Sequence, residues 1–293
     1  MGRAAIDSVG RKPAWLRVRH PGGGVYERLQ GILASNRVHT VCRSAGCPNI
    51  GKCWSAGTAT LMLLGRRCSR SCRFCGVGGG PCEPLDRDEP RRITAAVKAM
   101  KLSHVVVTSV TRDDLPDGGA AVWVEAIRQI RRAAPAATIE ALVPDFLGRR
   151  KNWQEVFAAR PDVLAHNVET VPRLYPLVRP AADFDRSLGL LRAAAEANLP
   201  AKSGLMVGLG ETISEVIETL RSLRCAGVRM VTVGQYLRPS PRHLAVARYV
   251  RPAEFDELSR RAADIGFEGV ACGPLVRSSY RAEQLARAIG LEG

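Results

Sequence analysis

The sequence lacks the long apolar segments and the aromatic content that several classes of protein require. No run of about 18 apolar residues is present, so we expect no membrane-spanning helix. Met1 to Arg11 carries basic side chains but no apolar h-region, so we expect no secretory signal. Phe, Trp and Tyr make up only 5% of the 293 residues. No helix-turn-helix, RNA-recognition or zinc-finger pattern occurs, which argues against a nucleic-acid partner.

Acidic residues are scarce relative to basic ones. The chain has 43 Lys and Arg against 28 Asp and Glu, a formal net charge of +15. Such a charge attracts a polyanion or an acidic protein. The arginines are scattered over the whole chain, which disfavours a dedicated nucleic-acid surface.

Cysteine, in contrast, is abundant and clustered. Six of the nine cysteines lie between Cys42 and Cys75. Disulfide frameworks are typical of short secreted chains, whereas this chain is long and shows no signal segment. Metal ligation in a reducing, cytoplasmic compartment is therefore the better interpretation. Cys225 and Cys272 lie outside this cluster and are expected to be small buried hydrophobes. Cys82 has no predicted role.

The motif Cys68-Ser-Arg-Ser-Cys72-Arg-Phe-Cys75 has the spacing C-x3-C-x2-C. Zinc sites usually take four ligands in paired sets, and thiolates also hold [4Fe-4S] clusters. Three close cysteines without a local fourth ligand would leave one iron open to a substrate or cofactor. With Phe74 before the last cysteine, the motif resembles the signature of radical S-adenosylmethionine (radical SAM) enzymes. A zinc loop is the alternative.

A second triplet, Cys42, Cys47 and Cys53, has the spacing C-x4-C-x5-C. Pooling all six cysteines into zinc sites fits the usual spacings badly, so a second cluster is the simplest account. The segments Thr40-Val-Cys, Cys-Pro-Asn-Ile-Gly51 and Cys-Trp54, followed by the C-x3-C-x2-C motif, resemble the lipoyl synthase family. One departure is Arg43-Ser44, where family members commonly carry acidic residues.

From Arg91 onward, helical patterns alternate with short apolar runs that are typical of buried parallel strands. This alternation predicts an α/β fold with a parallel sheet and right-handed crossovers. The family resemblance implies a partial (β/α)6 radical SAM barrel over residues 60–250, with an N-terminal arm over 1–59 that carries the second triplet and a C-terminal extension over 251–293. The predicted strands are Thr60 to Leu64, His104 to Val110, Thr138 to Val143, Val163 to Asn167, Ser203 to Gly208 and Met230 to Gln235. The predicted helices are Val25 to Ala34, Arg91 to Met100, Ala120 to Ala133, Trp153 to Ala159, Arg186 to Ala197, Ser214 to Cys225, Pro252 to Ile265 and Arg281 to Ile289.

Sites in such folds lie at the carboxyl ends of the strands, so the residues that follow each apolar run are candidates for binding S-adenosylmethionine. Among these candidates, acidic side chains and backbone groups could bind the amino group of S-adenosylmethionine, and a carboxylate or amide could bind its ribose. Glycines could let the backbone approach the nucleotide. Each also has a plain structural interpretation as a turn residue, helix start or surface charge. The stretches that contain them resemble lipoyl synthases at matching positions. With Phe74, these candidates are Thr108, Ser109, Asp113, Asn167, Glu169, Gly208, Gly210, Glu211, Gln235 and Arg238.

The C-terminal segment contains Arg277-Ser-Ser-Tyr280, a short motif that is weak on its own. In lipoyl synthases this motif supplies a serine oxygen as the fourth ligand of an auxiliary cluster, and Ser279 is the matching position. A hard oxygen is a poorer iron ligand than a soft thiolate, which suits a cluster that is consumed. The alternative is a capped turn before the last helix.

The resemblance covers Arg11 to Tyr280 and implies conversion of a protein-bound octanoyl-lysine into a lipoyl group. The C-x3-C-x2-C cysteines would hold the cluster that cleaves S-adenosylmethionine. The other triplet and Ser279 would hold a sacrificial [4Fe-4S] cluster that donates sulfur to C6 and C8. The implied partners are octanoylated lipoyl carrier domains or the glycine-cleavage carrier protein, an electron donor and a cluster-repair protein. Two alternatives stay open: a radical SAM paralogue that inserts sulfur elsewhere, and a metal-bearing nucleic-acid-binding protein.

Overall fold

The computed structural model describes residues 11–18, 22–56 and 58–291. Residues 1–10 and 19–21 of the predicted arm, and residues 57 and 292–293, lie outside the described residues. One curved sheet has the strand order β1-β2-β5-β6-β7-β8-β9-β10, and only the β1–β2 pair is antiparallel. Its strands are β1 His39–Thr40, β2 Thr60–Leu63, β5 His104–Ser109, β6 Thr138–Leu142, β7 Val163–Ala165, β8 Ala201–Val207, β9 Val228–Gln235 and β10 Gly269–Gly273.

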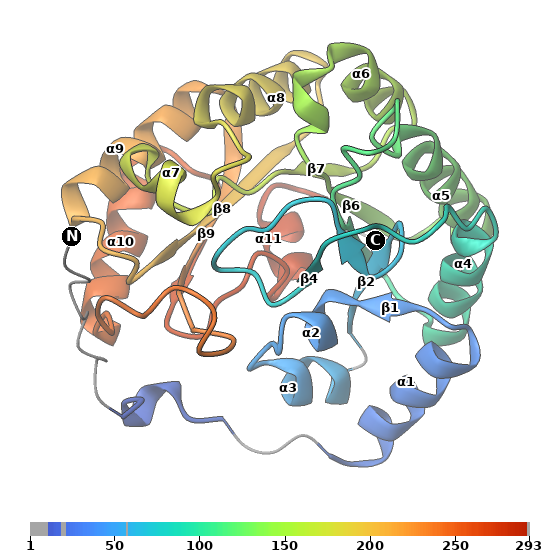
Figure 1. Cartoon of the computed structure of the whole chain (residues 1–293), viewed down its shortest axis with the longest axis horizontal. Helices are drawn as coiled ribbons and strands as arrows, with labels where there is room; N and C mark the ends of the chain where they lie inside the picture. The colour runs from blue at the N-terminus through green and yellow to red at the C-terminus, as the bar shows by residue number, and fades with distance from the viewer. Residues whose placement is uncertain (1–10, 19–21, 57, 292–293) are drawn as a thin grey trace.

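Helices cover the outside of this sheet (Figure 1). They are α4 Glu89–Met100, α5 Ala120–Ala133, α6 Arg150–Ala158, α8 Phe184–Glu196, α9 Ile213–Cys225 and α10 Pro252–Ile265. The predicted partial (β/α)6 barrel is therefore confirmed, because β2 and β5 to β9 are its six strands. The N-terminal and C-terminal extensions each add one edge strand, β1 and β10, that the sequence patterns did not predict. A small second sheet joins β3 Arg67–Cys68 to β4 Gly78–Gly79.

The remaining helices lie in the extensions or in the loops that follow the strands. They are α1 Gly24–Ser35, α2 Val41–Ser44, α3 Ile50–Ser55, α7 Tyr175–Val178 and α11 Ala282–Ala288, with short 3-10 helices at Ala14–Leu16, Phe146–Gly148 and Pro172–Leu174.

The two faces of the sheet differ because side chains alternate along each strand. On β5, Val105 and Val107 face the outer helices and pack in a core that includes Trp123 and Ile127 of α5. The alternate residues, such as Thr108 on β5 and Glu140 on β6, face the inside of the ring. The apolar core thus lies between sheet and helices, and the inner face keeps polar groups available for a site.

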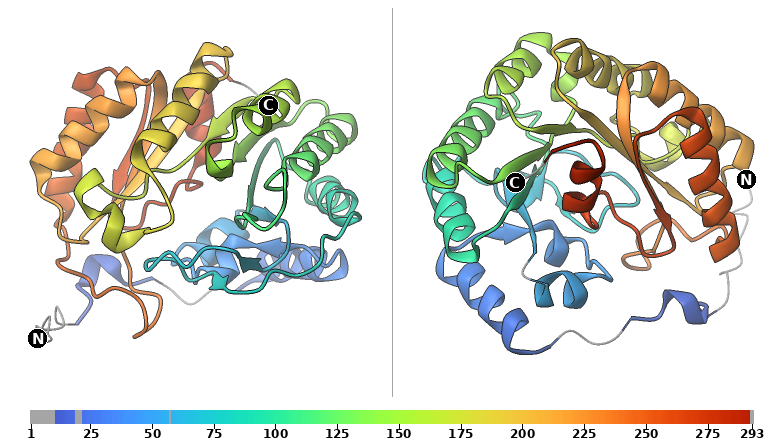
Figure 2. Two further views of the ribbon diagram at one scale, coloured as in Figure 1. Left: turned by 45° about the horizontal axis from the view of Figure 1, so that its top comes forward. Right: turned by 180° about the vertical axis from the view of Figure 1, so that it is seen from behind.

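The inside of the ring is closed at the amino ends of the strands by α11. Leu285 of α11 packs against Val163 of β7 and Met230 of β9. Gly269 of β10 leaves room for Met230 in this contact, because a Cβ there would lie 2.9 Å from Met230 Cγ. Figures 1 and 2 show α11 inside the ring, on the side opposite the Cys68–Cys75 loop. Any site inside the ring therefore opens toward the carboxyl ends of the strands.

Two sequence-based expectations are wrong in detail. Strand β8 begins at Ala201, not at Ser203, because Lys202 is buried in an ion pair with Glu140 and does not end the strand. Cys225 is exposed at the end of α9, not buried, whereas Cys272 is half-buried in β10. Glu140 neutralises Lys202, which allows Lys202 to be buried within the strand. Cys225 lies at the end of an outer helix and is therefore exposed to solvent.

Candidate active site

The Cys68–Cys75 loop follows β2 and β3 at the carboxyl end of the sheet. Backbone hydrogen bonds fix it at both ends: Ser69 N–H donates to Thr111 O at 3.0 Å, and Arg73 N–H donates to Val178 O at 2.9 Å. His243 Nε2 lies 2.9 Å from Cys75 O. The loop is thus held by segments that follow three different strands.

Arg70 is the central side chain of this loop. Its Nε and NH2 donate to Asp113 at 2.6 and 3.0 Å, and its NH1 and NH2 donate to Asp145 at 3.1 and 2.6 Å. Only 5% of the Arg70 side chain is exposed, and the Asp145 side chain is fully buried. Burial acts to raise the pKa of Asp145, but Arg70 lowers it overall. The guanidinium group of Arg70 therefore ties the loop to the segments that follow β5 and β6.

The sulfur of Cys68 already accepts two backbone hydrogen bonds. Thr111 N–H lies 3.3 Å and Arg70 N–H 3.4 Å from its Sγ. These two donors fix the position of the sulfur at the end of β3. Burial raises the pKa of Cys72, and it raises that of Cys75 to about 12. These two sulfurs are therefore protonated at neutral pH without iron, and cluster assembly must release protons.

The second cysteine triplet is held by two short helices. Cys42 lies in α2, whose first turn is capped by Thr40 Oγ1, which accepts from Arg43 N–H at 3.4 Å. Cys47 N–H donates to Cys42 O at 2.9 Å, and Cys53 lies in α3. Burial raises the pKa of Cys53 to about 11. All three thiols are free of disulfides.

The Arg277–Tyr280 motif lies against this second triplet. Asn49 Nδ2 donates to Leu275 O at 2.6 Å, and Lys52 Nζ lies 3.0 Å from the Tyr280 hydroxyl. Ser279 Oγ accepts a hydrogen bond of 2.7 Å from Thr60 Oγ1 at the start of β2. The motif, more than 200 residues away in the sequence, is thus held beside α3 by Tyr280 and at the start of β2 by Ser279.

The two cysteine segments also contact each other. A Cβ at Gly76, next to Cys75, would lie 3.1 Å from Ala45 Cα and 3.2 Å from Ser44 O. A residue with a side chain at Gly76 would therefore push the loop away from α2. Within residues 11–18, 22–56 and 58–291, no group of three or more His, Cys, Asp or Glu side chains is arranged to hold a single metal ion.

Three predicted cofactor-binding residues carry polar groups near the carboxyl ends of β5 and β7. Ser109 Oγ and Asn167 Oδ1 are buried and have no hydrogen-bond partner in the described part of the chain. Glu169 has a positive φ of 66°, and burial raises its pKa against the opposing charge of Arg179. Because unpaired buried polar atoms are costly, these groups fit a polar ligand such as S-adenosylmethionine.

Other predicted residues are engaged by the chain itself. Thr108 Oγ1 donates to Leu142 O at 3.1 Å, and Asp113 is paired with Arg70. Glu211 accepts the backbone N–H groups of Gly208, at 2.5 Å, and Leu209, at 2.9 Å. These groups shape the loops around the site.

The residues after β9 are similarly engaged. Gln235 Nε2 donates to three carbonyl groups, those of Val207, Tyr236 and Arg248, each at 3.1 Å. Arg238 is exposed and donates to His243 O at 2.9 Å. Phe74 is half-buried against the core around β8 and β9, and Gly210, with φ of 111°, has no atom within 4 Å of a Cβ position.

Sequence reasoning missed a buried ionic group on the inner face. Lys202 Nζ lies 2.8 and 2.9 Å from the carboxylate oxygens of Glu140, and His104 Nε2 lies 3.6 Å from the same carboxylate. Burial opposes ionisation of Glu140, yet Lys202 and His104 lower its pKa overall. Charged residues of opposite sign inside two apolar runs were the signal that could have revealed this pair.

Comparison with known proteins identifies the family. Lipoyl synthase of Acidothermus cellulolyticus is 51% identical over 98% of this chain and 88% of its own length. The chain belongs to the lipoyl synthase family. Lipoyl synthases of Mycolicibacterium smegmatis and Nitrosospira multiformis are each 50% identical, over 97% and 98% of this chain and 90% and 92% of their own lengths. The sequence profile of the Radical SAM superfamily matches residues 62–223. The chain is thus a radical SAM enzyme.

Solved structures agree with this fold at low sequence identity. Methylornithine synthase superposes with a TM-score of 0.53 and 14% identity, over 90% of this chain and 88% of its own. SuiB of Streptococcus suis, in a structure bound to S-adenosylmethionine, gives 0.56 and 11%, over 70% and 48%. Across the described ranges, no helix is long and apolar enough to cross a membrane.

Proposed function

We propose that the chain acts as a lipoyl synthase, a radical SAM sulfurtransferase that inserts two sulfur atoms, at C6 and C8, into an octanoyl group bound to a lysine of a carrier protein. The observation that supports this most is the meeting of three segments: the Cys68–Cys75 loop, the α2–α3 segment with its own cysteine triplet, and the Arg277–Tyr280 motif.

The cysteines of the first motif, Cys68, Cys72 and Cys75, would hold one [4Fe-4S] cluster. When bound, this cluster supplies, with S-adenosylmethionine, the strong oxidant needed to remove hydrogen from an unactivated C–H bond. The contribution of the chain is to position this cluster. Arg70 fixes the loop, and the backbone N–H groups of Arg70 and Thr111 donate to the sulfur of Cys68.

S-adenosylmethionine would lie at the carboxyl ends of β5 and β7. Ser109 Oγ and Asn167 Oδ1 offer hydrogen-bond acceptors without a present partner among the described residues, and Glu169 offers a carboxylate. These three are our preferred contacts among the predicted set, because the polar groups of Thr108, Asp113, Glu211 and Gln235 are already engaged.

Cys42, Cys47, Cys53 and Ser279 would hold a second [4Fe-4S] cluster, which supplies the sulfur. The hydrogen bond from Thr60 keeps Ser279 Oγ at the start of β2, and Lys52 of α3 contacts the neighbouring Tyr280. Arg277 NH1 donates to Val276 O at 2.7 Å and to Gln235 O at 3.2 Å, which ties the motif to the end of β9. Burial lowers the pKa of Arg277, while Cys47 and Glu169 act to raise it.

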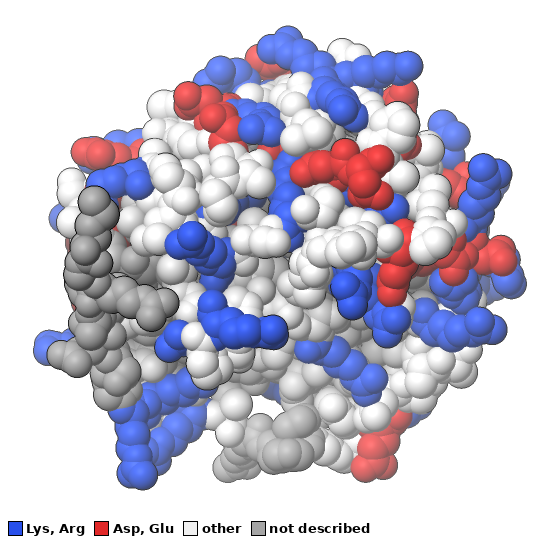
Figure 3. Space-filling view, viewed as in Figure 1, with Lys and Arg blue, Asp and Glu red and all other residues white. Residues whose placement is uncertain are grey.

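The partners of this reaction follow from its chemistry. The substrate is an octanoylated lipoyl carrier domain or a glycine-cleavage carrier protein. An electron donor must reduce the first cluster, and a cluster-repair protein must rebuild a consumed second one. Basic side chains are spread over the face that contains the carboxyl ends of the strands (Figure 3), which suits an acidic carrier.

Single-turnover product analysis with an octanoylated carrier domain tests the proposal. The parent chain should form lipoyl product and 5'-deoxyadenosine. A Cys42→Ala/Cys47→Ala/Cys53→Ala variant should still form 5'-deoxyadenosine but no sulfur-containing product. If that variant inserts sulfur, the donor lies elsewhere. If the parent forms 5'-deoxyadenosine but leaves octanoyl-lysine unchanged, a paralogue with another substrate is the correct interpretation.

A further inference from the structure

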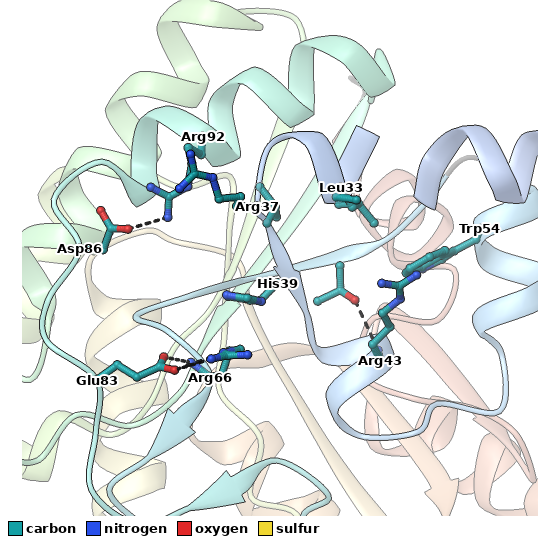
Figure 4. Close-up of a pocket in the computed structure, with 12 residues that line it drawn as sticks. Leu33, Arg37, His39, Arg43, Trp54, Arg66, Glu83, Asp86 and Arg92 are labelled. Atoms are coloured by element: carbon teal, nitrogen blue, oxygen red, sulfur yellow. Dashed lines mark hydrogen bonds and ion pairs between the residues drawn. The ribbon is translucent and has the colours of Figure 1, made fainter. Parts of the chain in front are cut away.

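A pocket of about 490 Å³ lies at the side of the barrel, between α1, β1, α2 and the segment that leads into α4 (Figure 4). Leu33, Val38 and Trp54 contribute apolar surface to it. Its polar lining is unusual, because four arginines reach it from four separate parts of the chain: Arg37, Arg43, Arg66 and Arg92.

Two of the four guanidinium groups are paired. Arg66 donates to Glu83 Oε1 through Nε at 3.2 Å and NH2 at 3.0 Å. Arg92 NH2 donates to Asp86 Oδ2 at 2.8 Å. Figure 4 shows both pairs on one side of the pocket. These carboxylates neutralise their own arginines and leave no negative charge for the other two.

Arg37 and Arg43 have no carboxylate partner in the described part of the chain. Both are exposed. The Arg43 guanidinium lies over the Trp54 ring, 5.1 Å from its centroid, which restricts its motion without neutralising it. The pocket therefore holds two uncompensated positive charges at its solvent side.

Further donors line the same pocket. Trp54 Nε1 and Arg92 Nε are buried and make no hydrogen bond to any described residue. Burial and the charge of Arg66 lower the pKa of His39, so its ring is neutral at pH 7 and adds no positive charge of its own. Guanidinium groups pair best with planar carboxylates and with phosphates, because both accept two parallel hydrogen bonds.

We propose that this pocket is a docking point for the carrier protein, where Arg37 and Arg43 bind an acidic side chain of that protein. The inference rests on the proposed function, which requires a protein substrate. The apolar walls at Leu33 and Val38 fit the CH2 groups of a glutamate, and the exposed arginines are within reach of a neighbouring protein surface.

The position of the pocket favours a carrier over a free anion. Thr40 and Arg43, which line it, flank Cys42 in the sequence, and Arg66 lies two residues before Cys68. A protein bound here therefore lies beside both cysteine segments. A long octanoyl-lysine arm can then enter the ring from the carboxyl ends of the strands while its carrier stays outside.

The test compares two double variants that remove the same charge. Arg37→Ala/Arg43→Ala changes the pocket, and Arg128→Ala/Arg192→Ala is the matched control, because both control arginines are exposed on outer helices α5 and α8. The dissociation constant of an octanoylated carrier domain is measured for each. Two lost charge pairs at an interface should weaken binding about five- to tenfold in the pocket variant. The control should change it less than about twofold, since it loses only long-range attraction.

A short octanoyl-lysyl peptide without carboxylates serves as the second substrate. Both variants should turn it over at equal rates, which shows that each is folded and loaded with its clusters. Equal weakening of carrier binding in both variants, or unchanged binding in the pocket variant, would overturn the docking proposal. If the parent binds the carrier but turns over neither substrate, the proposed function fails, while the comparison of binding still reports on the pocket.

Discussion

Replacing Arg70 by alanine should destabilise the chain more than any surface charge change, because Arg70 neutralises a fully buried carboxylate. Its side chain is 5% exposed, and it donates to Asp145 at 2.6 Å and to Asp113 at 2.6 Å. In the Arg70→Ala variant, Asp145 keeps the Arg186 NH1 group at 3.5 Å and the hydrogen bond from Leu147 N–H at 3.2 Å. The Asp113 side chain is 24% exposed, so water can replace Arg70 there.

The cost follows from the uncompensated Asp145. Removing one partner of a buried ion pair costs about 3–5 kcal/mol. Because Arg186 remains and Asp113 can be hydrated, we expect the lower end, about 3 kcal/mol. Arg66→Ala is the matched control: it breaks an ion pair with Glu83 in which 65% of the arginine side chain is exposed. Such surface pairs contribute about 0–1 kcal/mol.

The pH dependence gives a second, independent check. In the parent, the pKa of Asp145 is lowered, so its contribution to stability is present above its unfolded pKa and is lost as the pH falls through the folded value. In the Arg70→Ala variant, burial without the arginine raises the pKa of Asp145. The variant therefore loses most stability at high pH, where Asp145 is ionised. The difference in the free energy of unfolding between parent and variant should therefore shrink as the pH is lowered through the raised pKa of Asp145 in the variant.

Urea denaturation followed by circular dichroism measures these differences on the iron-free chain. Arg70→Ala/Asp145→Asn should recover part of the loss, because no charge is then buried without a partner. A cost of Arg70→Ala below about 1 kcal/mol, equal to that of a surface pair, would refute the reasoning. So would a difference that does not change with pH.

Three further predictions concern the clusters and the carrier. Replacing Cys68, Cys72 and Cys75 together by alanine should abolish 5'-deoxyadenosine formation, and continued reductive cleavage of S-adenosylmethionine would contradict the assignment. Ser279→Cys replaces a hard ligand by a soft one, so the second cluster should assemble while release of iron and delivery of the second sulfur fail. Full lipoyl product at the parent rate would exclude this role. Carrier binding should weaken steeply with salt, because exposed charges are screened beyond about 10 Å at 0.1 M. A flat salt dependence would show that the net charge serves something else.

The regular part of the fold was predictable because its strands are short buried runs and its helices are amphipathic. Helices α5 and α10 begin and end at the predicted residues. The edge strands were not predictable, for physical reasons. Strand β1 has only two residues, and β10 is a run of small residues between glycines, so neither shows a period. Both exist because neighbouring strands offer unpaired backbone groups.

The sequence did not reveal which charged residues are buried, because their ion-pair partners lie far along the chain. Arg70 lies between two cysteines of the motif, and its partners are 43 and 75 residues further along the chain. Because Lys202 is charged, the predicted strand began after it, at Ser203. In the structure Lys202 lies within the strand, because Glu140, 62 residues away, neutralises it. A local pattern records the type of a side chain but not the partner that makes its burial possible.

The same principle divides the predicted cofactor-binding residues. All of them lie at or after the carboxyl ends of strands, and sequence position alone cannot rank them. The structure ranks them by whether the chain itself satisfies their hydrogen bonds. Gln235 and Glu211 are satisfied internally, so a ligand that bound them would have to break existing bonds. Ser109 Oγ and Asn167 Oδ1 are buried and lack a partner in the described ranges, a state that costs free energy until a ligand supplies one. Removing their polar atoms should therefore weaken S-adenosylmethionine binding with little loss of stability, whereas the same change at Gln235 should chiefly destabilise the fold.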